Sequence, residues 1–220
     1  MPPSPSTATP PIARSLFVFA LVYGGMTVIA GVLAFKQVAL GALAVEAGIF
    51  AFLLLVVLSS AVAQLHGRRT ADRMVLWGFV PLALSVLLIF IVLRLPPSAE
   101  MPAENIAAFG TVLSSTPRIM AAGPVAYLVS LLLNVWIFSR LRGSGETNTI
   151  GLMVRGAIAS ALSQAIDSVI FVTLAFYGEF DIGNLLVGQV IAKVALSIVL
   201  IPFLITGGVA LARRLDSRPG

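Results

Sequence analysis

Six long apolar runs occupy most of this chain, and they constrain its fold more than any other feature. The runs cover residues 15–35, 38–65, 74–95, 119–141, 150–177 and 182–211. Each is long enough, at about 1.5 Å of helical rise per residue, to cross about 30 Å of hydrocarbon. Because the runs are continuous rather than alternating, they predict helices and not the strands of a membrane barrel. The sequence therefore predicts an all-α membrane protein built as a six-transmembrane-helix bundle.

The composition supports this class and excludes several others. Hydrophobic residues make up 59% of the chain and charged residues 10%, with a mean hydropathy of +1.04, which does not describe a soluble domain. The net charge of +5 does not indicate nucleic-acid binding, because most arginines lie beside apolar runs, where they set topology. The chain has no cysteine and one histidine, so we expect neither a metal site nor a cofactor.

The same boundaries divide the chain into one domain and two tails. Residues 1–13, rich in Pro, Ser and Thr, predict a disordered cytoplasmic tail, residues 14–214 the membrane domain, and residues 215–220 a second cytoplasmic tail. The connections on one side carry most of the arginines, which predicts a multi-pass inner-membrane protein with both termini cytoplasmic. The longest connection, residues 96–117, is then expected to be an outer surface loop.

Two ionisable residues lie deep inside the last two runs. An unpaired charge at the bilayer centre costs about 2.5–3.5 kcal/mol on insertion scales, so such residues usually pair or line a polar cavity. Asp167 and Lys193 each lie thirteen residues from Phe180, where we expect the chain to turn. That spacing places both about 15–20 Å deep at helical rise. We predict that the two side chains share one level near the midplane, as an ion pair or as part of a binding site.

Other polar residues repeat at helical spacing beside this pair. One stripe in the fifth run contains Gly156, Ser160, Ser163, Gln164, Asp167 and Phe171, and one in the sixth contains Gln189, Lys193 and Ser197. In the fourth run, Tyr127, Ser130 and Asn134 share a face. These stripes predict a ligand site, because their donors and acceptors exceed what one ion pair can satisfy. The alternative is a packing seam held by small residues and amides.

Individual roles follow from side-chain chemistry. Asp167 can accept hydrogen bonds from a two-donor edge of a planar ligand, while Gln164, Gln189 and Asn134 can read a carbonyl or amino group. Phe171, Phe176 or Tyr127 can stack on its face, unless these rings only pack in the core or against lipid. We expect Glu46, near the outer end of the second run, to be hydrated and to have no role in the site.

The residues of the last three runs carry a family resemblance. The matching positions are Arg118-Ile119, Ala126-Tyr127, Asn134 and residues 137–142, then Arg155, Ala159-Ser160, Ser163-Gln164, Asp167, Ile170-Phe171, Ala175-Phe176, Gly178, Gln189, Lys193 and Pro202. This pattern resembles the queuosine precursor transporter family, also called the vitamin uptake transporter family. Many members look acidic at the positions of Ser60 and Gln64, where this chain is neutral.

The resemblance implies a function, a fold and partners. It implies import of a queuosine precursor, 7-cyano-7-deazaguanine or a related 7-deazapurine, for queuosine salvage, in a fold like the substrate-binding subunits of energy-coupling-factor transporters. The alternative is a substrate-binding membrane subunit for a vitamin-like ligand that needs a separate energising module. The preferred precursor and the energy source stay open, as does a homodimer built on Gly24, Gly25 and Gly31. We expect no enzyme activity, because His66 lies at the membrane edge without a serine paired to it.

Overall fold

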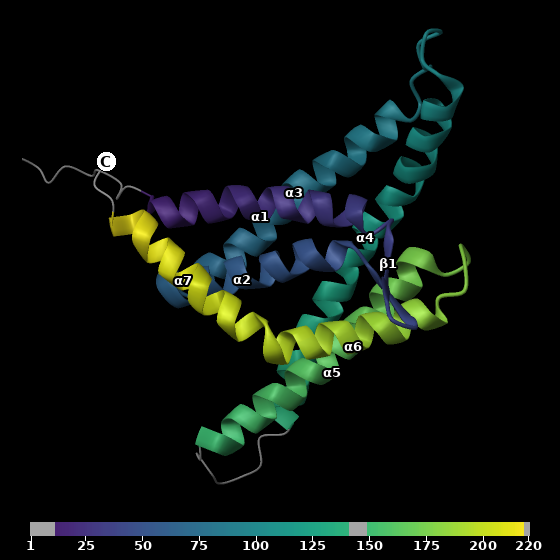
Figure 1. Cartoon of the computed structure of the whole chain (residues 1–220). Helices are drawn as coiled ribbons and strands as arrows, with labels where there is room; N and C mark the ends of the chain where they lie inside the picture. Colours follow the sequence, from purple (N-terminus) through teal and green to yellow (C-terminus); the bar gives the residue numbers. More distant parts are fainter. Residues whose placement is uncertain (1–11, 141–148, 218–220) are drawn as a thin grey trace, which may run out of the picture.

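The computed structural model describes residues 12–140 and 149–217 of the chain, and nearly all of them are helical (Figure 1). The helices are α1 (Arg14–Leu33), α2 (Gly48–His66), α3 (Arg68–Val92), α4 (Ala103–Arg140), α5 (Thr149–Phe176), α6 (Gly183–Val199) and α7 (Ile201–Ser217). Two short strands, β1 (Gln37–Leu40) and β2 (Leu43–Glu46), form an antiparallel hairpin between α1 and α2. The expected tails fall largely on residues 1–11 and 218–220, outside the described residues.

The hairpin replaces the expected start of the second helix. Leu40 pairs with Leu43, so Gly41 and Ala42 form a two-residue turn. Gly41 has a φ of 63°, a value that the first position of a type II′ hairpin turn requires and that glycine adopts without steric cost. The prediction of helix from residue 38 was wrong because the strands are as apolar as the helix that follows them. As a result α2 begins only at Gly48, and Glu46 ends a strand.

Two further boundaries differ from the sequence prediction. The sixth run is not one helix, because α6 ends at Val199 and α7 begins at Ile201. Pro202 lacks the backbone N–H that would bond to the carbonyl of Ile198, which explains the break at this point. The expected loop at residues 96–117 is mostly helix, since α4 already begins at Ala103.

The elements that build the interior come from both ends of the chain. Helix α1 packs on α2 and α3, α4 packs on α5, α6 contacts both α5 and β2, and α7 lies along α2 (Figure 1). Gly31 of α1 lies against Met120 of α4, where a Cβ would clash with the methionine side chain. This close approach of α1 and α4 uses one of the small residues of α1 inside the chain rather than between chains.

The outer surface is largely apolar. Large side chains such as Phe17, Leu84 and Phe203 are exposed on it, an arrangement that suits contact with lipid rather than water. Among the described residues, three helices, α1, α2 and α3, are long and apolar enough to cross a membrane, and shorter apolar helical segments cover Ala161–Phe176 and Gly183–Leu196. The helical membrane class is confirmed, and the arrangement as six spans stays a prediction.

Candidate functional site

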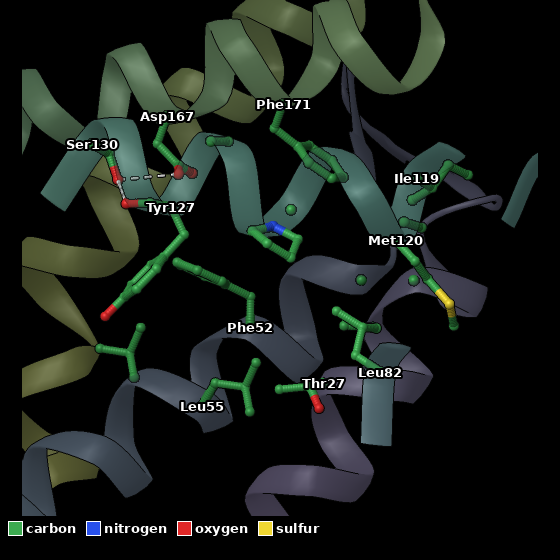
Figure 2. Close-up of a pocket in the computed structure, with 18 of the residues that line it drawn as sticks. Thr27, Phe52, Leu55, Leu82, Ile119, Met120, Tyr127, Ser130, Asp167 and Phe171 are labelled. Atoms are coloured by element: carbon green, nitrogen blue, oxygen red, sulfur yellow. Dashed lines mark hydrogen bonds between the residues drawn. The ribbon is translucent and has the colours of Figure 1, made fainter. Parts of the chain in front are cut away.

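A cavity of about 230 Å³ lies in the interior of the helices (Figure 2). Its volume is slightly below the range of about 300–1,000 Å³ that is typical of pockets for drug-sized ligands, so it suits a small molecule. Its wall combines apolar side chains with a few buried polar groups. The polar and aromatic residues that line it are Tyr23, Thr27, Glu46, Phe52, Ser59, Phe79, Tyr127, Ser130, Ser163, Gln164, Asp167, Phe171 and Lys193.

The predicted ion pair lies in the wall of this cavity. Nζ of Lys193 donates to Oδ2 of Asp167 at 2.6 Å, and Oγ of Ser130 donates to Oδ1 at 3.3 Å. Asp167 and Lys193 are each only 5% exposed. The prediction that α5 and α6 bring these two residues to one level is confirmed. Their role in binding stays a prediction.

Aromatic rings surround the charged pair. The Lys193 ammonium lies 4.6 Å from the ring centroid of Phe52 and 5.6 Å from that of Phe171, within the range of cation–π attraction. Tyr127 packs against Phe79, with the ring centroids 6.2 Å apart. Figure 2 shows Phe52, Tyr127 and Phe171 reaching into the space between α2, α4 and α5. Phe52 was not predicted, because a phenylalanine inside an apolar run carries no signal that separates a cavity wall from packing.

Glu46 belongs to the site, which corrects the expectation that it is hydrated. Its side chain is 4% exposed and lines the cavity. Nε2 of Gln189 donates to Oε1 of Glu46 at 2.7 Å, and the backbone N–H of Glu46 donates to Oε1 of Gln189 at 3.3 Å. The hairpin explains the difference, because it turns the chain back toward α6 before α2 begins. The sequence signal that could have indicated a buried role for Glu46 is the presence of an acidic residue inside an apolar run.

The other predicted residues have different surroundings. Gln164 lines the cavity, and its Oε1 is buried without a hydrogen-bond partner in the described part of the chain. Gln189 is fully buried but does not line the cavity, since its amide holds Glu46 instead. The side chain of Asn134 lies outside the described residues. Ser60 is half-buried and Gln64 is exposed, and neither residue lines the cavity. The two positions where this chain is neutral therefore lie outside the cavity wall.

We use the name cavity cluster for five of these residues, which form two hydrogen-bonded groups, Glu46 with Gln189 and Asp167 with Ser130 and Lys193. They come from β2, α4, α5 and α6: Glu46, Ser130, Asp167, Gln189 and Lys193. Two carboxylates and one ammonium group lie in this cluster. The site therefore offers charged and neutral hydrogen-bonding groups beside aromatic faces, a combination that fits a planar polar ligand.

A second group of polar residues joins the ends of three helices. We call Ser15, His66 and Asp216 the helix-end cluster. The backbone N–H and the hydroxyl of Ser15 donate to the two oxygens of Asp216 at 2.8 and 2.7 Å. Oγ of Ser15 also lies 2.8 Å from Nε2 of His66. Because the hydroxyl proton is given to Asp216, Nε2–H of His66 is the donor in that contact.

This cluster pairs the histidine with a serine, which the sequence did not predict. The arrangement is not a catalytic triad, since Asp216 binds the serine and lies 4.0 Å from the same Nε2 of His66. A triad needs the carboxylate on the opposite ring nitrogen. Ser15 is also completely buried. The contacts instead fasten the start of α1 to the ends of α2 and α7, so both ends of the described chain lie on one side.

The helices and the cavity define a helical membrane protein with an internal cavity. The sequence profile of a family described as "Putative vitamin uptake transporter" matches residues 46–207. This match covers most of the chain and extends over all five members of the cavity cluster. The chain belongs to the vitamin uptake transporter family.

A curated relative is more distant. A protein of Bacillus subtilis (strain 168) named "Probable queuosine precursor transporter" is 24% identical over 141 residues, which are 63% of this chain and 60% of that protein. The chain thus aligns with less than two thirds of the relative's length. No solved structure is significantly similar to this chain.

Proposed function

We propose that this protein is a membrane transporter that imports a queuosine precursor, 7-cyano-7-deazaguanine or a related 7-deazapurine base. The observation that carries the proposal is the cavity, whose wall combines ionisable groups, an amide and aromatic rings in a member of this transporter family. The name of the Bacillus subtilis relative supports the substrate class. The cavity volume favours a free base over a larger nucleoside.

The chemistry of a 7-deazaguanine matches the groups in the wall. The base presents a carbonyl acceptor, an adjacent N–H and a 2-amino group on one edge of a flat ring. The ring can stack between aromatic faces, of which Phe52 and Phe171 are the nearest to the ion pair. Lys193 is the cation that can donate to the carbonyl, and Gln164 offers a free acceptor. The carbonyl and one donor of the base therefore each have a complementary group, and Glu46 and Asp167 are carboxylates in the same wall that can accept from the other donor.

The helix-end cluster supports the proposed orientation. It places Ser15 and Asp216 on one side of the bundle. Arg14, Arg213 and Arg214 lie next to these residues in the sequence. An excess of arginine marks the cytoplasmic face, so we propose that both termini face the cytoplasm of a cell whose inner membrane contains the protein.

Uptake by cells that cannot synthesise 7-deazaguanines tests the function. Cells expressing the wild-type chain should accumulate radiolabelled 7-cyano-7-deazaguanine, and Asp167→Asn should reduce uptake at least tenfold at equal expression. Gln64→Ala is the matched control, because Gln64 is a polar residue of α2 outside the cavity. Absence of uptake by well-inserted wild-type protein contradicts the proposal.

Reconstitution separates transport from binding alone. Purified protein in liposomes should take up the base without any other protein. A substrate-binding subunit that depends on an energising module would bind the base in detergent and yet fail to load liposomes.

A further inference from the structure

Glu46 lines the cavity, and the two oxygens of its carboxylate differ in their partners. Its Oε1 is held by the amide of Gln189 at 2.7 Å. Its Oε2 is buried and has no hydrogen-bond partner of standard geometry in the described part of the chain. Buried polar atoms are nearly always paired in folded proteins, so an unpaired one on a residue that lines a cavity marks a position where a ligand atom can bind.

The backbone around Glu46 is arranged to hold its carboxylate. The backbone N–H groups of Gly48 and Ile49, in the first turn of α2, lie near it. A Cβ on Gly48 would lie 2.5 Å from Oε2. The absence of a side chain at this position therefore makes room for the carboxylate at the start of α2.

Asp167 differs from Glu46 in this respect. Lys193 donates to one of its oxygens and Ser130 to the other. A ligand that used Asp167 as its main acceptor would compete with a short ion-pair contact. A ligand that used Glu46 would donate to an oxygen without a hydrogen-bond partner of standard geometry and would leave the ion pair intact.

We propose that Glu46, rather than Asp167, accepts the hydrogen bonds of the substrate's two-donor edge and so determines specificity for a 2-amino-substituted ring. This inference rests on the proposed function, because that function supplies the substrate class. Each carboxylate oxygen can accept more than one hydrogen bond, so Oε1 can take a second donor beside that of Gln189. A ring that lacks the 2-amino group leaves a buried acceptor unpaired and binds more weakly.

A pair of ligands that differ only in the 2-amino group tests the inference directly. Binding of 7-deazaguanine and 7-deazahypoxanthine to the purified full-length protein is measured by isothermal titration calorimetry. The wild type should prefer 7-deazaguanine at least tenfold. Glu46→Gln should reduce that preference to less than about threefold, because an amide presents one acceptor and a donor where the carboxylate presents two acceptors.

Two further variants locate the effect. Asp167→Asn should lower affinity for both ligands and keep the preference for the 2-amino group. Glu104→Gln, a carboxylate-to-amide change at an exposed position in the first turn of α4, should leave both affinities unchanged. Loss of the preference in Asp167→Asn together with its retention in Glu46→Gln would overturn the inference and assign the edge to Asp167.

The remaining outcomes are also decisive. If Glu46→Gln does not fold, Glu46→Asp keeps the charge and withdraws the carboxylate by one methylene. It should then weaken 7-deazaguanine binding at least tenfold, and unchanged binding would contradict the inference. Wild-type protein that binds 7-deazaguanine without preference over 7-deazahypoxanthine overturns the role of Glu46 alone. Wild-type protein that binds neither base overturns the proposed function as well.

Discussion

The cavity cluster and the helix-end cluster both join residues far apart in the sequence, but they differ in how their hydrogen-bonding groups are used. In the helix-end cluster, Asp216 uses both oxygens on Ser15, and the remaining lone pair of the serine faces His66. In the cavity cluster, Oε2 of Glu46 stays unpaired although it is buried. A cluster whose groups satisfy one another fixes helices, whereas a cluster with unpaired buried groups beside a cavity is suited to bind a ligand.

The largest expected effect comes from breaking the buried ion pair. Lys193→Met leaves Asp167 charged and without its main partner at a position that is 5% exposed. Breaking a buried pair by removing one partner typically costs about 3–5 kcal/mol. We expect a large fall in the thermal unfolding temperature in detergent, measured by tryptophan fluorescence, together with loss of uptake.

The double variant separates stability from function. Asp167→Asn combined with Lys193→Met removes both charges, so most of the lost stability should return while uptake stays absent. If the double variant transports like the wild type, the ion pair only holds α5 against α6. The cavity cluster would then have the same structural role as the helix-end cluster.

The next largest effect is expected from Gly48→Ala, which fills the space beside the Glu46 carboxylate. A Cβ in Gly48→Ala would lie 2.5 Å from the carbonyl oxygen of Ala30 and from Oε2 of Glu46, so α1 or the carboxylate must move. Overpacking of this kind costs about 1–3 kcal/mol. We expect weaker ligand binding and a lower unfolding temperature. Gly25→Ala is the matched control, because a Cβ there meets nothing within 4 Å; an equal loss in both variants would refute the explanation.

A smaller effect is expected in the helix-end cluster. Ser15→Ala removes the hydroxyl that donates to Asp216 and accepts from His66, while its backbone N–H still reaches Asp216. The loss should be about 1 kcal/mol. The unfolding temperature should fall slightly, and the affinity for 7-deazaguanine should not change. A change in affinity would mean that the two clusters are coupled and do not have separate roles.

The sequence was sufficient to predict the ion pair of Asp167 and Lys193 but not the contact between Glu46 and Gln189. Asp167 and Lys193 could be placed by counting helical residues from one turn, because both lie on continuous helices that are adjacent in the chain. Glu46 and Gln189 are 143 positions apart, and their contact depends on a hairpin that is as apolar as a helix. The pairing of Ser15 with Asp216 likewise depends on where α7 ends relative to α1, which no local pattern encodes.

The smallest expected effect is a pH dependence confined to the helix-end cluster. Hydrogen bonds from the backbone N–H and the hydroxyl of Ser15 hold the pKa of Asp216 below its usual range, and His66 lowers it further. A lowered pKa in the folded state means that the stabilisation is present at neutral pH and is lost as the pH falls below the ordinary aspartate value of about 4. The wild type should therefore be more stable than Asp216→Asn at pH 7, and the difference should shrink as the pH approaches 3.

Thermal unfolding of both proteins in detergent from pH 7 to pH 3 measures this difference. Comparing the two curves removes the contribution of the other carboxylates, which titrate in the same range in both proteins. Because Asp216 lies at the end of α7 and its side chain is 33% exposed, solvent screening should keep the effect below that of Ser15→Ala. A difference that stays constant over this range would show that the carboxylate charge does not stabilise the helix ends and that only the shape of the side chain matters there.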